Sequence, residues 1–523
     1  MARTPALLRY APLLACLLVA VWLLWWQPPR AVSALLVIVA YAGTCLHIWR
    51  SHRKQARPAS CLNADTLLIG YASQGGQAQE LAERSARQLR EAGLDVNVRP
   101  LNAIEPATLS QQSRALFVVS TYGEGEAPDN AARFDQRVLR GELDLSTVDF
   151  ALLALGDHQY PRFCGFARHL DSQLQHLGAR PLFDRLEADR CDPAVLRQWQ
   201  QQLGLLVGKR DIADWEAPAY QRWRLAERRC LNPGSQGRPA FHLQLHPPTE
   251  ASPRWQAGDI AEIGPCQPPE RVEALLKRLE LEGGQIHSDG QSLAWHLARR
   301  QLPNDPEPLR GLDADSLLRS LPRLPHRDYS IASLPTDGAL ELLVRLQQDA
   351  SGMPGLGSGW LCQHAPLGTP IDLRIRANPA FRLATDSGPL ILIGNGTGLA
   401  GLRAHLRERR QLGQHGHWLL FGERNAGCDL FFERELRDWQ RSGHLARLDL
   451  AFSRDQAQPV YVQHLLRDAA DELRSWIERG ASLLVCGSLK GMGEEVDGLL
   501  HGLLGQQEIA ALREAGRYRR DLY

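Results

Sequence analysis

Residues 115–130 carry the sequence ALFVVSTYGEGEAPDN, a short apolar run that passes directly into a glycine-rich loop. An unbroken apolar run of this length is typical of a parallel strand buried on both faces. TLLIGYASQGGQA (residues 66–78) repeats the arrangement upstream, and FALLALGDHQYPRFCG (residues 150–165) repeats it downstream. Because helical segments follow the flanking loops, the stretch predicts a doubly wound α/β sheet with its ligand at the carboxyl ends of the strands.

The loops after these strands have the composition of a ligand site. Small residues from Ser73 to Ala78 allow backbone amides to close on a phosphate at a helix N-terminus. The loop lacks the lysine of a nucleotide-hydrolysing phosphate loop, which favours a single phosphate held by hydroxyl and amide donors. Tyr122 and Tyr160 each follow a strand and suit a planar ring that must be stacked and shielded from water. Ordinary packing of both tyrosines is the alternative.

A different pattern follows from about residue 210. FHLQLHPP (residues 241–248) and RWQAGDIAEI (residues 254–263) predict strands of an antiparallel barrel, and residues 270–281 and 291–300 predict helices. In HRDYSIAS (residues 326–333), Arg327 offers a bidentate cation for a pyrophosphate, Tyr329 a ring face and Ser330 a hydroxyl. GLGSGWL, residues 355–361, is a second small-residue loop suited to phosphates.

The last third of the chain predicts another parallel sheet. PLILIGNGTGLAGLRAHLRER (residues 389–409) is a buried strand, a G-x-G-x-G loop and a helix, the context in which such glycines bind a dinucleotide phosphate. Further strands are expected in HWLLFGERN (residues 417–425), LARLDLAFSRDQ (residues 445–456) and ASLLVCGSLKGM (residues 481–492).

Together these motifs resemble the diflavin reductases, the family of NADPH–cytochrome P450 reductase and the sulfite reductase flavoprotein. TYGEGEAPDNA, LGDHQYPRFCG, RDYSIAS, FGERN, AFSRDQ, YVQH, VCG and RYRRDLY occur in the family order, over nearly the whole chain from Thr66 to Tyr523. The resemblance implies a flavodoxin-like FMN domain in residues 64–205, an FAD-binding antiparallel β-barrel with a shortened helical insertion in residues 215–385, and an NADP-binding doubly wound α/β domain in residues 386–523.

The resemblance also implies which residues bind each cofactor. For FMN these are Ser73, Gln74, Gly75, Gly76, Gln77, Ala78, Ser120, Thr121, Tyr122, Gly123, Leu155, Gly156, Asp157, Tyr160, Phe163 and Cys164. For FAD they are Arg327, Asp328, Tyr329, Ser330, Leu343, Val344, Arg345, Gly355, Leu356, Gly357, Ser358 and Tyr523, the last covering the flavin ring. For NADPH they are Thr397, Ser453, Arg454, Tyr461 and Gln463.

Hydride transfer needs few reactive side chains because the cofactors carry the chemistry. By resemblance, Ser330, Cys486 and Asp521 line the point where nicotinamide meets the flavin, with Ser330 bonding flavin N5, Cys486 packing beside the nicotinamide and Asp521 stabilising its developing positive charge. A buried core thiol is the alternative for Cys486. No metal site is predicted.

The sequence departs from the family at several positions. Pro459 stands where a lysine is usual in the stretch after Arg454, so Arg454 is expected to bind the 2′-phosphate and to keep the preference for NADPH. Ser488 replaces an aspartate, and Asn395 and Gly401 replace prolines. The stretch between Asp259 and Arg327 is short, which predicts a reduced helical connecting domain.

The first 58 residues predict two transmembrane helices and a basic linker. Residues 10–29 and 31–49 contain no charged side chain, and a spanning helix needs roughly 20 mostly apolar residues. Basic residues precede the first run and follow the second, which places both ends in the cytoplasm. A cleaved signal peptide is the alternative, but no small-residue cleavage site follows the first run. We therefore expect a hairpin in the cytoplasmic membrane, with membrane lipid as its partner and the catalytic domains facing the cytoplasm.

The predicted function is NADPH-dependent transfer of electrons through FAD and FMN to a haemoprotein or another redox acceptor, membrane-bound acceptors included. A membrane reductase for ferric chelates or quinones is the alternative enzyme, and a degenerate flavin-binding relay subunit is the non-enzyme alternative. The net charge of +1 gives no reason to expect nucleic acid, and ten scattered cysteines favour reduced thiols. An acidic rim for a basic redox partner is expected at Glu124, Glu126, Asp129, Glu187, Asp189 and Asp192.

Overall fold

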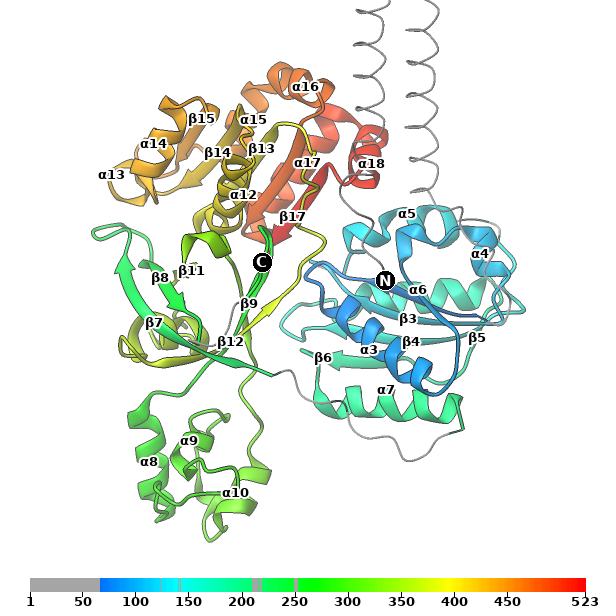
Figure 1. The fold of residues 1–523 in the computed structure, drawn as a ribbon, viewed down its shortest axis with the longest axis vertical. Helices are drawn as coiled ribbons and strands as arrows, with labels where there is room; N and C mark the ends of the chain where they lie inside the picture. Colours follow the sequence, from blue (N-terminus) through cyan, green and yellow to red (C-terminus); the bar gives the residue numbers. More distant parts are fainter. Residues whose placement is uncertain are drawn as a thin grey trace, which may run out of the picture. The chain divides into compact units, whose positions relative to one another are not determined.

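The computed structural model describes residues 66–523, apart from residues 124, 140, 142, 209–214, 216–218 and 249–252. Every described residue lies in one compact unit, Ala64–Tyr523 (Figure 1). The predicted membrane hairpin in residues 1–58 therefore lies outside the described residues. Within the described ranges, no helix combines the length and the apolar character needed to cross a bilayer.

The N-terminal part, residues 66–208, is built on a parallel sheet (Figure 1). The order of its strands is β2-β1-β3-β4-β5, with β6 also paired to β4. This is the flavodoxin-like order, so the predicted fold of this part is confirmed. The strands are β1 (Leu67–Ala72), β2 (Val96–Pro100), β3 (Arg114–Ser120), β4 (Asp149–Gly156), β5 (Arg180–Pro181) and β6 (Leu186–Asp189).

Helices cover both faces of this sheet. On one face, Trp199 donates its indole N–H to Ser85 Oγ at 3.0 Å, which joins α7 to α3 over a core that includes Leu116 and Val118. Phe117 points to the opposite face by strand alternation and contacts Phe134 there, with ring centroids 6.4 Å apart. The helices are α3 (Gln77–Glu91), α4 (Pro106–Ser110), α5 (Ala132–Phe134), α6 (Gly165–His176) and α7 (Pro193–Leu206), with short turns at η2 (Leu101–Ala103), η3 (Asp129–Ala131) and η4 (Asp135–Leu139).

The C-terminal part, residues 219–523, begins with an antiparallel sheet in the order β10-β9-β12-β7-β8-β11. An additional bridge joins Ile331, directly after β10, to Leu342 of β11, so the two ends of this order meet at one point. The antiparallel pairing agrees with the prediction, and closure into a barrel stays a prediction. The elements are β7 (Gln221–Cys230), β8 (Ala240–His246), β9 (Ile260–Gly264), β10 (Arg327–Ser330), β11 (Leu340–Arg345), β12 (Pro370–Arg376), α11 (Leu356–Gly359), η6 (Pro335–Asp337) and η7 (Trp360–His364).

A small helical insertion lies between β9 and β10, where a reduced connecting domain was expected. Its helices have a core of their own, which includes Leu276, Leu297 and Leu317. The helices are α8 (Pro269–Leu279), α9 (Leu293–Leu297) and α10 (Ala314–Ser320), with a turn at η5 (Glu307–Leu309). The helix predicted for residues 270–281 thus matches α8, whereas the one predicted for residues 291–300 is shorter.

The C-terminal part ends in a second parallel sheet, in the order β15-β14-β13-β16-β17, as the repeated apolar runs predict. Ile391 and Ile393 of β13 enter the core under α15, α16 and α17, whereas Leu390 and Leu392 enter the core under α12 and α14. The elements are β13 (Leu390–Asn395), β14 (His417–Glu423), β15 (Leu445–Phe452), β16 (Ser482–Gly487), β17 (Tyr518–Leu522), α12 (Leu399–Gln411), α13 (Ala426–Asp429), α14 (Glu433–Arg441), α15 (Val462–Asp468), α16 (Ala470–Glu478), α17 (Glu494–Leu504), α18 (Gln506–Glu514), η8 (Gly396–Gly398) and η9 (Leu489–Gly493).

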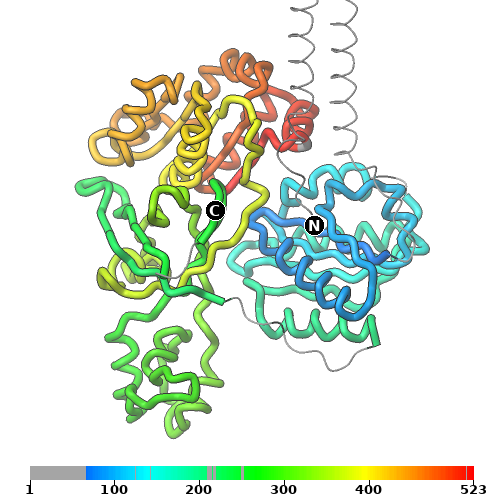
Figure 2. The backbone as a smooth tube through the Cα atoms, viewed as in Figure 1, coloured from blue at the N-terminus to red at the C-terminus, as the bar shows by residue number. Residues whose placement is uncertain are grey.

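The two sheets of the C-terminal part share a core. Leu343 of β11 packs in the same apolar cluster as Leu402 of α12 and Leu392 of β13. In the trace of Figure 2 the chain passes from β12 of the antiparallel sheet to β13 through residues 377–389, which form no helix or strand. The core also contains Ala332, which follows β10, and Cys486 of β16, so the end of β10 lies close to β16.

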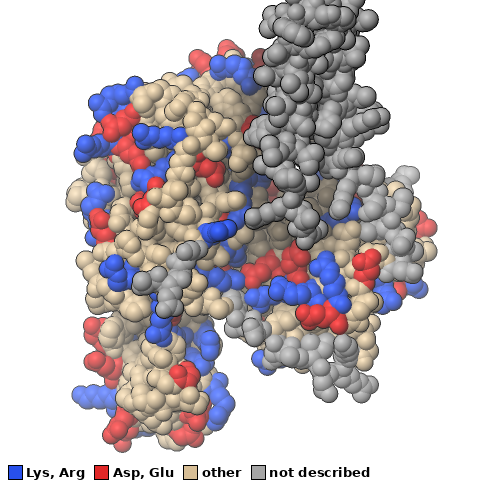
Figure 3. Space-filling model, viewed as in Figure 1, with Lys and Arg blue, Asp and Glu red and all other residues tan. Residues whose placement is uncertain are grey.

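Acidic and basic side chains are interspersed over the described surface that Figure 3 shows. This agrees with the nearly balanced charge of 60 basic and 59 acidic residues. The visible described face therefore has no broad field of one sign that would attract a partner by charge alone.

Candidate functional site

Three side chains from separate strands meet where the two sheets of the C-terminal part adjoin. Ser330 ends β10, Cys486 lies in β16 and Asp521 lies in β17. The Ser330 hydroxyl donates to Asp521 Oδ2 at 2.7 Å, and the Cys486 thiol lies 3.7 Å from the same oxygen. The structure thus brings together the three residues that the resemblance implied for hydride transfer.

The surroundings of this cluster control its protonation. Burial raises the pKa of Asp521 above its usual value, although the hydrogen bonds from Ser330 and Cys486 act in the opposite direction. Burial, followed by the nearby Asp521 carboxylate, raises the pKa of the Cys486 thiol well above its usual range. Cys486 is therefore a neutral thiol, which can pack against a ligand and donate a weak hydrogen bond but not act as a thiolate.

Gly401 of α12 leaves space beside the Cys486 thiol and Ser330. A Cβ atom at Gly401 would lie 3.3 Å from Cys486 Sγ and 3.6 Å from Ser330 Cβ. The family proline at this position is thus replaced by the residue that leaves the most space around the thiol.

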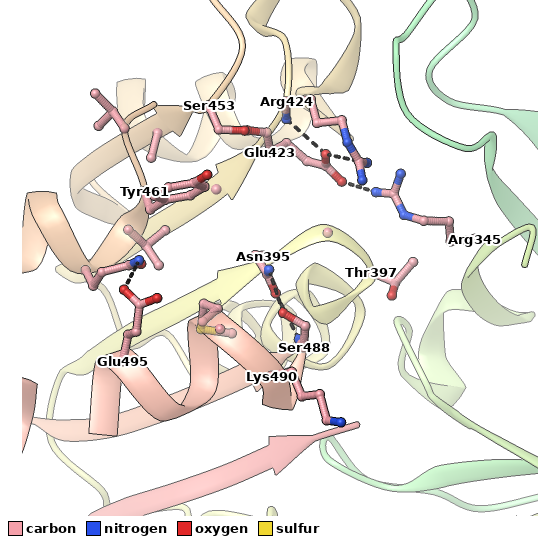
Figure 4. A pocket seen from close by; sticks show the side chains of 18 of the residues that line it. Arg345, Asn395, Thr397, Glu423, Arg424, Ser453, Tyr461, Ser488, Lys490 and Glu495 are labelled. Atoms are coloured by element: carbon pink, nitrogen blue, oxygen red, sulfur yellow. Dashed lines mark hydrogen bonds and ion pairs between the residues drawn. The ribbon is translucent and has the colours of Figure 1, made fainter. Parts of the chain in front are cut away.

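A cavity of about 580 Å³ opens at the carboxyl edge of the second parallel sheet (Figure 4). It receives residues that follow β13, β14, β15 and β16, as expected for a ligand site in such a sheet. All five residues predicted for NADPH line it, together with the C-terminal tyrosine: Thr397, Ser453, Arg454, Tyr461, Gln463 and Tyr523. Tyr523 donates to Thr397 Oγ1 at 3.2 Å, which sets the tyrosine ring at one end of the cavity.

The donor set of the cavity fits an anionic dinucleotide. Arg424, Arg454 and Lys490 line the cavity, and the carboxylate of Glu423 is engaged by Arg345 (Figure 4). Glu495 likewise accepts a hydrogen bond from Gln463 at 2.7 Å. Cations and hydroxyls at the cavity wall match the chemistry that phosphates require.

Sequence reasoning missed Arg424 and Lys490. Both belong to motifs quoted above, FGERN and SLKGM, but the prediction looked for a cation only near Pro459. Pro459 is exposed and does not line the cavity. Arg345, predicted to contact FAD, lies on the wall of the same cavity, and burial with the nearby Arg424 lowers its pKa to about 10.

The two polar departures from the family pattern form a pair. The Asn395 amide donates to Ser488 Oγ at 2.9 Å, and the Ser488 backbone N–H donates to Asn395 Oδ1 at 2.9 Å (Figure 4). Asn395 therefore holds the loop after β16 at the position where the family uses proline and aspartate. The departures compensate for one another and leave the cavity wall neutral at this point.

The residues predicted for FAD lie on β10, β11 and the α11 loop. Gly357 fits closely here, because an added Cβ would lie 2.6 Å from Arg327 Cγ and 2.8 Å from the Tyr329 hydroxyl. Gly355, Leu356 and Ser358 complete this turn, and the Ser358 hydroxyl accepts the Gln347 backbone N–H at 3.0 Å. Such a glycine cradle beside an arginine and a tyrosine fits a dinucleotide with a stacked ring.

Three other residues predicted for FAD have different surroundings. Asp328 forms an ion pair with Arg376, which neutralises both groups. The side chains of Leu343 and Val344 are buried in the hydrophobic cores on the two sides of β11. Only the backbone of these two residues is placed to meet a ligand.

In the N-terminal part, the predicted FMN loops gather at the carboxyl edge of its sheet. The loop Ser73–Ala78 is stabilised by Asn130, which accepts the Ser73 N–H at 3.0 Å. Gln77 begins α3 after Gly76, whose φ of 82° requires glycine, and Gly75 precedes it. The buried hydroxyl oxygens of Thr121 and Tyr122 have no hydrogen-bond partner among the described residues. These unpaired hydroxyls fit a polar ligand such as FMN.

The remaining FMN residues lie on the flanking strands and on the third loop. The Ser120 hydroxyl already donates to Ala72 O at 3.0 Å, and Gly123 has a φ of 54°. Leu155 and Gly156 end β4, and Asp157 pairs with Arg190 at 3.1 Å. Phe163 and Cys164 lie against Gly156, whereas Tyr160 is 36% exposed, unlike the buried Tyr122. The structure thus buries one of the two predicted stacking rings and exposes the other.

Several members of the predicted acidic rim bind groups of the chain itself, and their role toward a redox partner stays a prediction. Asp129 is paired with Arg520, Glu187 with Arg168 and Arg185, and Asp192 caps α7 by accepting the Ala194 N–H. Asp189 accepts the His158 backbone N–H, and Glu124 lies outside the described residues. The described carboxylates among these therefore bind donors of the chain itself, some of them, such as Arg520 for Asp129, distant in the sequence.

Among the described residues, one group of potential metal ligands lies close together: Glu262, His326 and Asp328. Arg374 donates to Glu262 at 2.7 Å, and Arg376 pairs with Asp328. Two guanidinium groups thus already balance these carboxylates, which disfavours a cation at this place.

Comparison with known proteins gives two matches to protein families. The family described as flavodoxin matches residues 69–199, and the family described as the oxidoreductase NAD-binding domain matches residues 392–497. These ranges contain the first parallel sheet and most of the second.

Whole-chain relatives cover both parts. The sulfite reductase [NADPH] flavoprotein alpha-component of Vibrio cholerae is 29% identical, over 90% of this chain and 90% of its own length. The protein of the same name from Bacillus subtilis is 28% identical, over 89% and 90%. The one from Yersinia enterocolitica is 29% identical, over 88% and 90%. The similarity therefore extends through all three sheets.

Proposed function

Because the chain belongs to the diflavin reductase family, we propose that it is an NADPH-dependent diflavin oxidoreductase of the sulfite reductase flavoprotein type. Electrons pass from NADPH through FAD to FMN, and then to a haemoprotein or a similar acceptor. The observation that carries this proposal is the meeting of Ser330, Cys486 and Asp521 at the junction of the two C-terminal sheets.

When bound, the nicotinamide and the flavins supply the hydride and electron transfer. The protein supplies the positions and the charges. Asp521 offers a carboxylate to the positive charge that develops on the nicotinamide, and Ser330 holds that carboxylate in one orientation through its 2.7 Å hydrogen bond. Cys486 offers a neutral, fully buried thiol as a packing surface.

The cavity supports the choice of NADPH as the electron donor. Arg454 is exposed, lines the cavity and is available to pair with a 2′-phosphate, while Lys490 lies near Ser488 on the cavity wall (Figure 4). Tyr523 lines the cavity and follows directly after β17, the strand that carries Asp521. We propose that Tyr523 covers the flavin ring and moves aside when nicotinamide arrives.

For FMN, we propose that the loops at Ser73–Ala78, Ser120–Gly123 and Leu155–Cys164 hold the cofactor. The unpaired hydroxyls of Thr121 and Tyr122 support this assignment. For the acceptor, support comes from the relatives, which are named as one component of a larger sulfite reductase. A component that delivers electrons requires a partner that receives them, and a haemoprotein is the partner we propose.

We also propose that residues 1–58 anchor the chain in the cytoplasmic membrane with the catalytic parts facing the cytoplasm. Support comes from the two charge-free runs and the basic residues that flank them. Reporter fusions at Arg53 and after Tyr523 test the topology. Both fusions are expected to report the cytoplasm, and a signal from the other side of the membrane at either position contradicts the hairpin.

The experiment that tests the proposed activity uses the purified full chain. Extraction of the bound flavins is expected to give FAD and FMN in equal amounts, and NADPH is expected to support reduction of both ferricyanide and cytochrome c. FAD without FMN contradicts the assignment of the N-terminal part. Failure to oxidise NADPH contradicts the proposal as a whole.

A further inference from the structure

The N-terminal and C-terminal parts meet through the loops predicted for FMN. A Cβ at Gly76 would lie 2.3 Å from Ala377 O, and one at Gly123 would lie 3.5 Å from Leu489 of η9. Gln74 donates its side-chain N–H to the Arg520 carbonyl at 2.8 Å. Two of the three loops therefore lie directly on the C-terminal part.

Arg520 of β17 is at the centre of this surface. Its Nε donates to Asp129 Oδ2 at 3.2 Å, and its Nη2 donates to Asp129 Oδ1, so the pair is bidentate. The Arg520 guanidinium also lies 5.0 Å from the centroid of the Tyr122 ring. One arginine thus holds a carboxylate and an aromatic ring of the N-terminal part at once, and its own side chain is 7% exposed.

The C-terminal part holds Arg520 in place for these contacts. Asp497 lies 3.3 Å from Arg520 Nη1, and Asp497 itself accepts hydrogen bonds from Tyr518 at 2.6 Å and from Arg513 at 2.9 Å. Arg513 also approaches Asp129, at 3.6 Å. The guanidinium is therefore preorganised by groups of its own part, which reduces the entropy lost when Asp129 binds.

The position of Arg520 along β17 links this surface to the hydride-transfer cluster. Successive residues of a strand point to opposite faces, so Arg520 and Asp521 face opposite sides of β17. On one side of the strand Arg520 pairs with Asp129, and on the other side Asp521 contacts Ser330 and Cys486. The residue that binds the N-terminal part, Arg520, is thus next in sequence to Asp521 of the hydride-transfer cluster.

We propose that Arg520 is a positioning residue that docks the N-terminal part on β17 in the arrangement that allows electrons to pass from FAD to FMN. This inference rests on the proposed function. Arg520 takes no part in hydride transfer, and the docked arrangement depends on its bidentate pair with Asp129 and on its contact with Tyr122.

The test compares Arg520→Gln with Arg519→Gln in the purified full chain. Arg519 lies on the same strand but donates to the Pro379 and Ala380 carbonyls of the C-terminal part, so it is a matched control. Removal of one partner from a buried charge pair is expected to slow electron transfer from FAD to FMN about tenfold. Stopped-flow spectroscopy after mixing with NADPH measures this rate, and flavin extraction confirms that FMN is retained.

Acceptor assays separate docking from hydride transfer. In Arg520→Gln, cytochrome c reduction is expected to fall with the FAD-to-FMN rate, whereas ferricyanide reduction stays within about twofold because FAD supplies it directly. Arg520→Lys, which keeps the charge but not the bidentate geometry, is expected to recover part of the loss. Arg519→Gln is expected to leave both assays unchanged.

A double-mutant cycle with Asp129→Asn identifies the contact. FAD-to-FMN electron transfer in the Asp129→Asn/Arg520→Gln chain is expected to be no slower than in either single variant. The effects of Asp129→Asn and Arg519→Gln on this rate are expected to be additive. Hydrogen–deuterium exchange should rise in residues 121–130 only when the pair is broken. An unchanged FAD-to-FMN rate in Arg520→Gln with FMN bound overturns the docking role, while a wild-type chain that fails to reduce ferricyanide with NADPH overturns the proposed function instead.

Discussion

The chain contains two parallel sheets that present their ligand sites in different ways. The sheet β1–β6 ends in loops with glycines and hydroxyls, and two cations of the C-terminal part, Arg520 and Arg376, approach these loops. The sheet β13–β17 ends in an open cavity, where Arg424, Arg454 and Lys490 follow its own strands and Arg345 comes from β11 of the same C-terminal part. The same layer arrangement therefore forms one site that the C-terminal part contacts from outside and one whose lining lies wholly within the C-terminal part.

This difference has a functional consequence. A cavity that carries its own cations can bind and release a soluble dinucleotide without any rearrangement of the N-terminal part. A site covered by contacts with Arg520 must be uncovered before a protein acceptor reaches it. The comparison therefore predicts that changes at the Ser330 cluster and in the cavity affect all acceptors, whereas changes in the FMN loops or at Arg520 affect only acceptors that depend on FMN.

The largest effect is expected from Asp521→Asn in the second sheet. Loss of a carboxylate beside developing charge is expected to slow hydride transfer about 10²–10³-fold with every acceptor. Asp471→Asn is the control, because Asp471 lies on α16 with a 96% exposed side chain. Stopped-flow reduction by NADPH measures the rate, and a normal rate in Asp521→Asn would remove this residue from the site.

The next effect concerns the first sheet. Replacement of Tyr122 and Tyr160 by alanine is expected to weaken FMN binding about a hundredfold, because each ring contributes burial and stacking. The C-terminal part has its own cores, so FAD content and ferricyanide reduction should persist. Full cytochrome c activity in this variant would mean that electrons do not pass through FMN.

A smaller effect is expected on the discrimination between NADPH and NADH at the cavity. Arg454→Ala is expected to raise the apparent KM for NADPH about thirtyfold, the value of one charge-assisted hydrogen bond, and to leave NADH nearly unaffected. Arg441→Ala, at an exposed ion pair on α14, serves as the control. An equal loss with both nucleotides would show that Arg424 or Lys490 binds the 2′-phosphate instead.

The smallest effect is a shift in pH dependence. The Ser330 hydrogen bond favours ionised Asp521, so it lowers the pKa of a carboxyl that burial raises. Ser330→Ala removes this opposition and raises the pKa of Asp521 further. Since activity needs the carboxylate, the acid limb of the hydride-transfer profile should move to higher pH. A limb that stays in place would mean that another group controls it.

The fold could be predicted from the sequence because the patterns that indicate it are local. Most of the apolar runs quoted for the two parallel sheets pass directly into a loop with glycine, and period, length and turn residues all lie within a short window. The antiparallel strands and α8 were recognised in the same way. Closure of the antiparallel sheet depends on pairing between distant residues, such as Ile331 with Leu342, and local patterns carry little of that information.

Less of the site could be predicted from the sequence, because its residues are far apart in the chain. Ser330 and Asp521 are 191 positions apart, and only resemblance to a family brought them together. Asp129 and Arg520 are 391 positions apart. An aspartate in an acidic loop indicates a solvated surface, so its buried partner could be found only in the folded structure. Arg424 and Lys490 were missed because the cavity wall combines four strands.

In the proposed path, NADPH delivers its hydride beside Asp521, and the electrons leave through the N-terminal part. The most direct test is anaerobic stopped-flow mixing of the purified full chain with NADPH, with FAD and FMN followed separately. We expect FAD to be reduced before FMN in the wild type, both to slow together in Asp521→Asn, and only FMN reduction to slow in Arg520→Gln. Reduction of FMN before FAD, or at an undiminished rate in Asp521→Asn, would contradict the account.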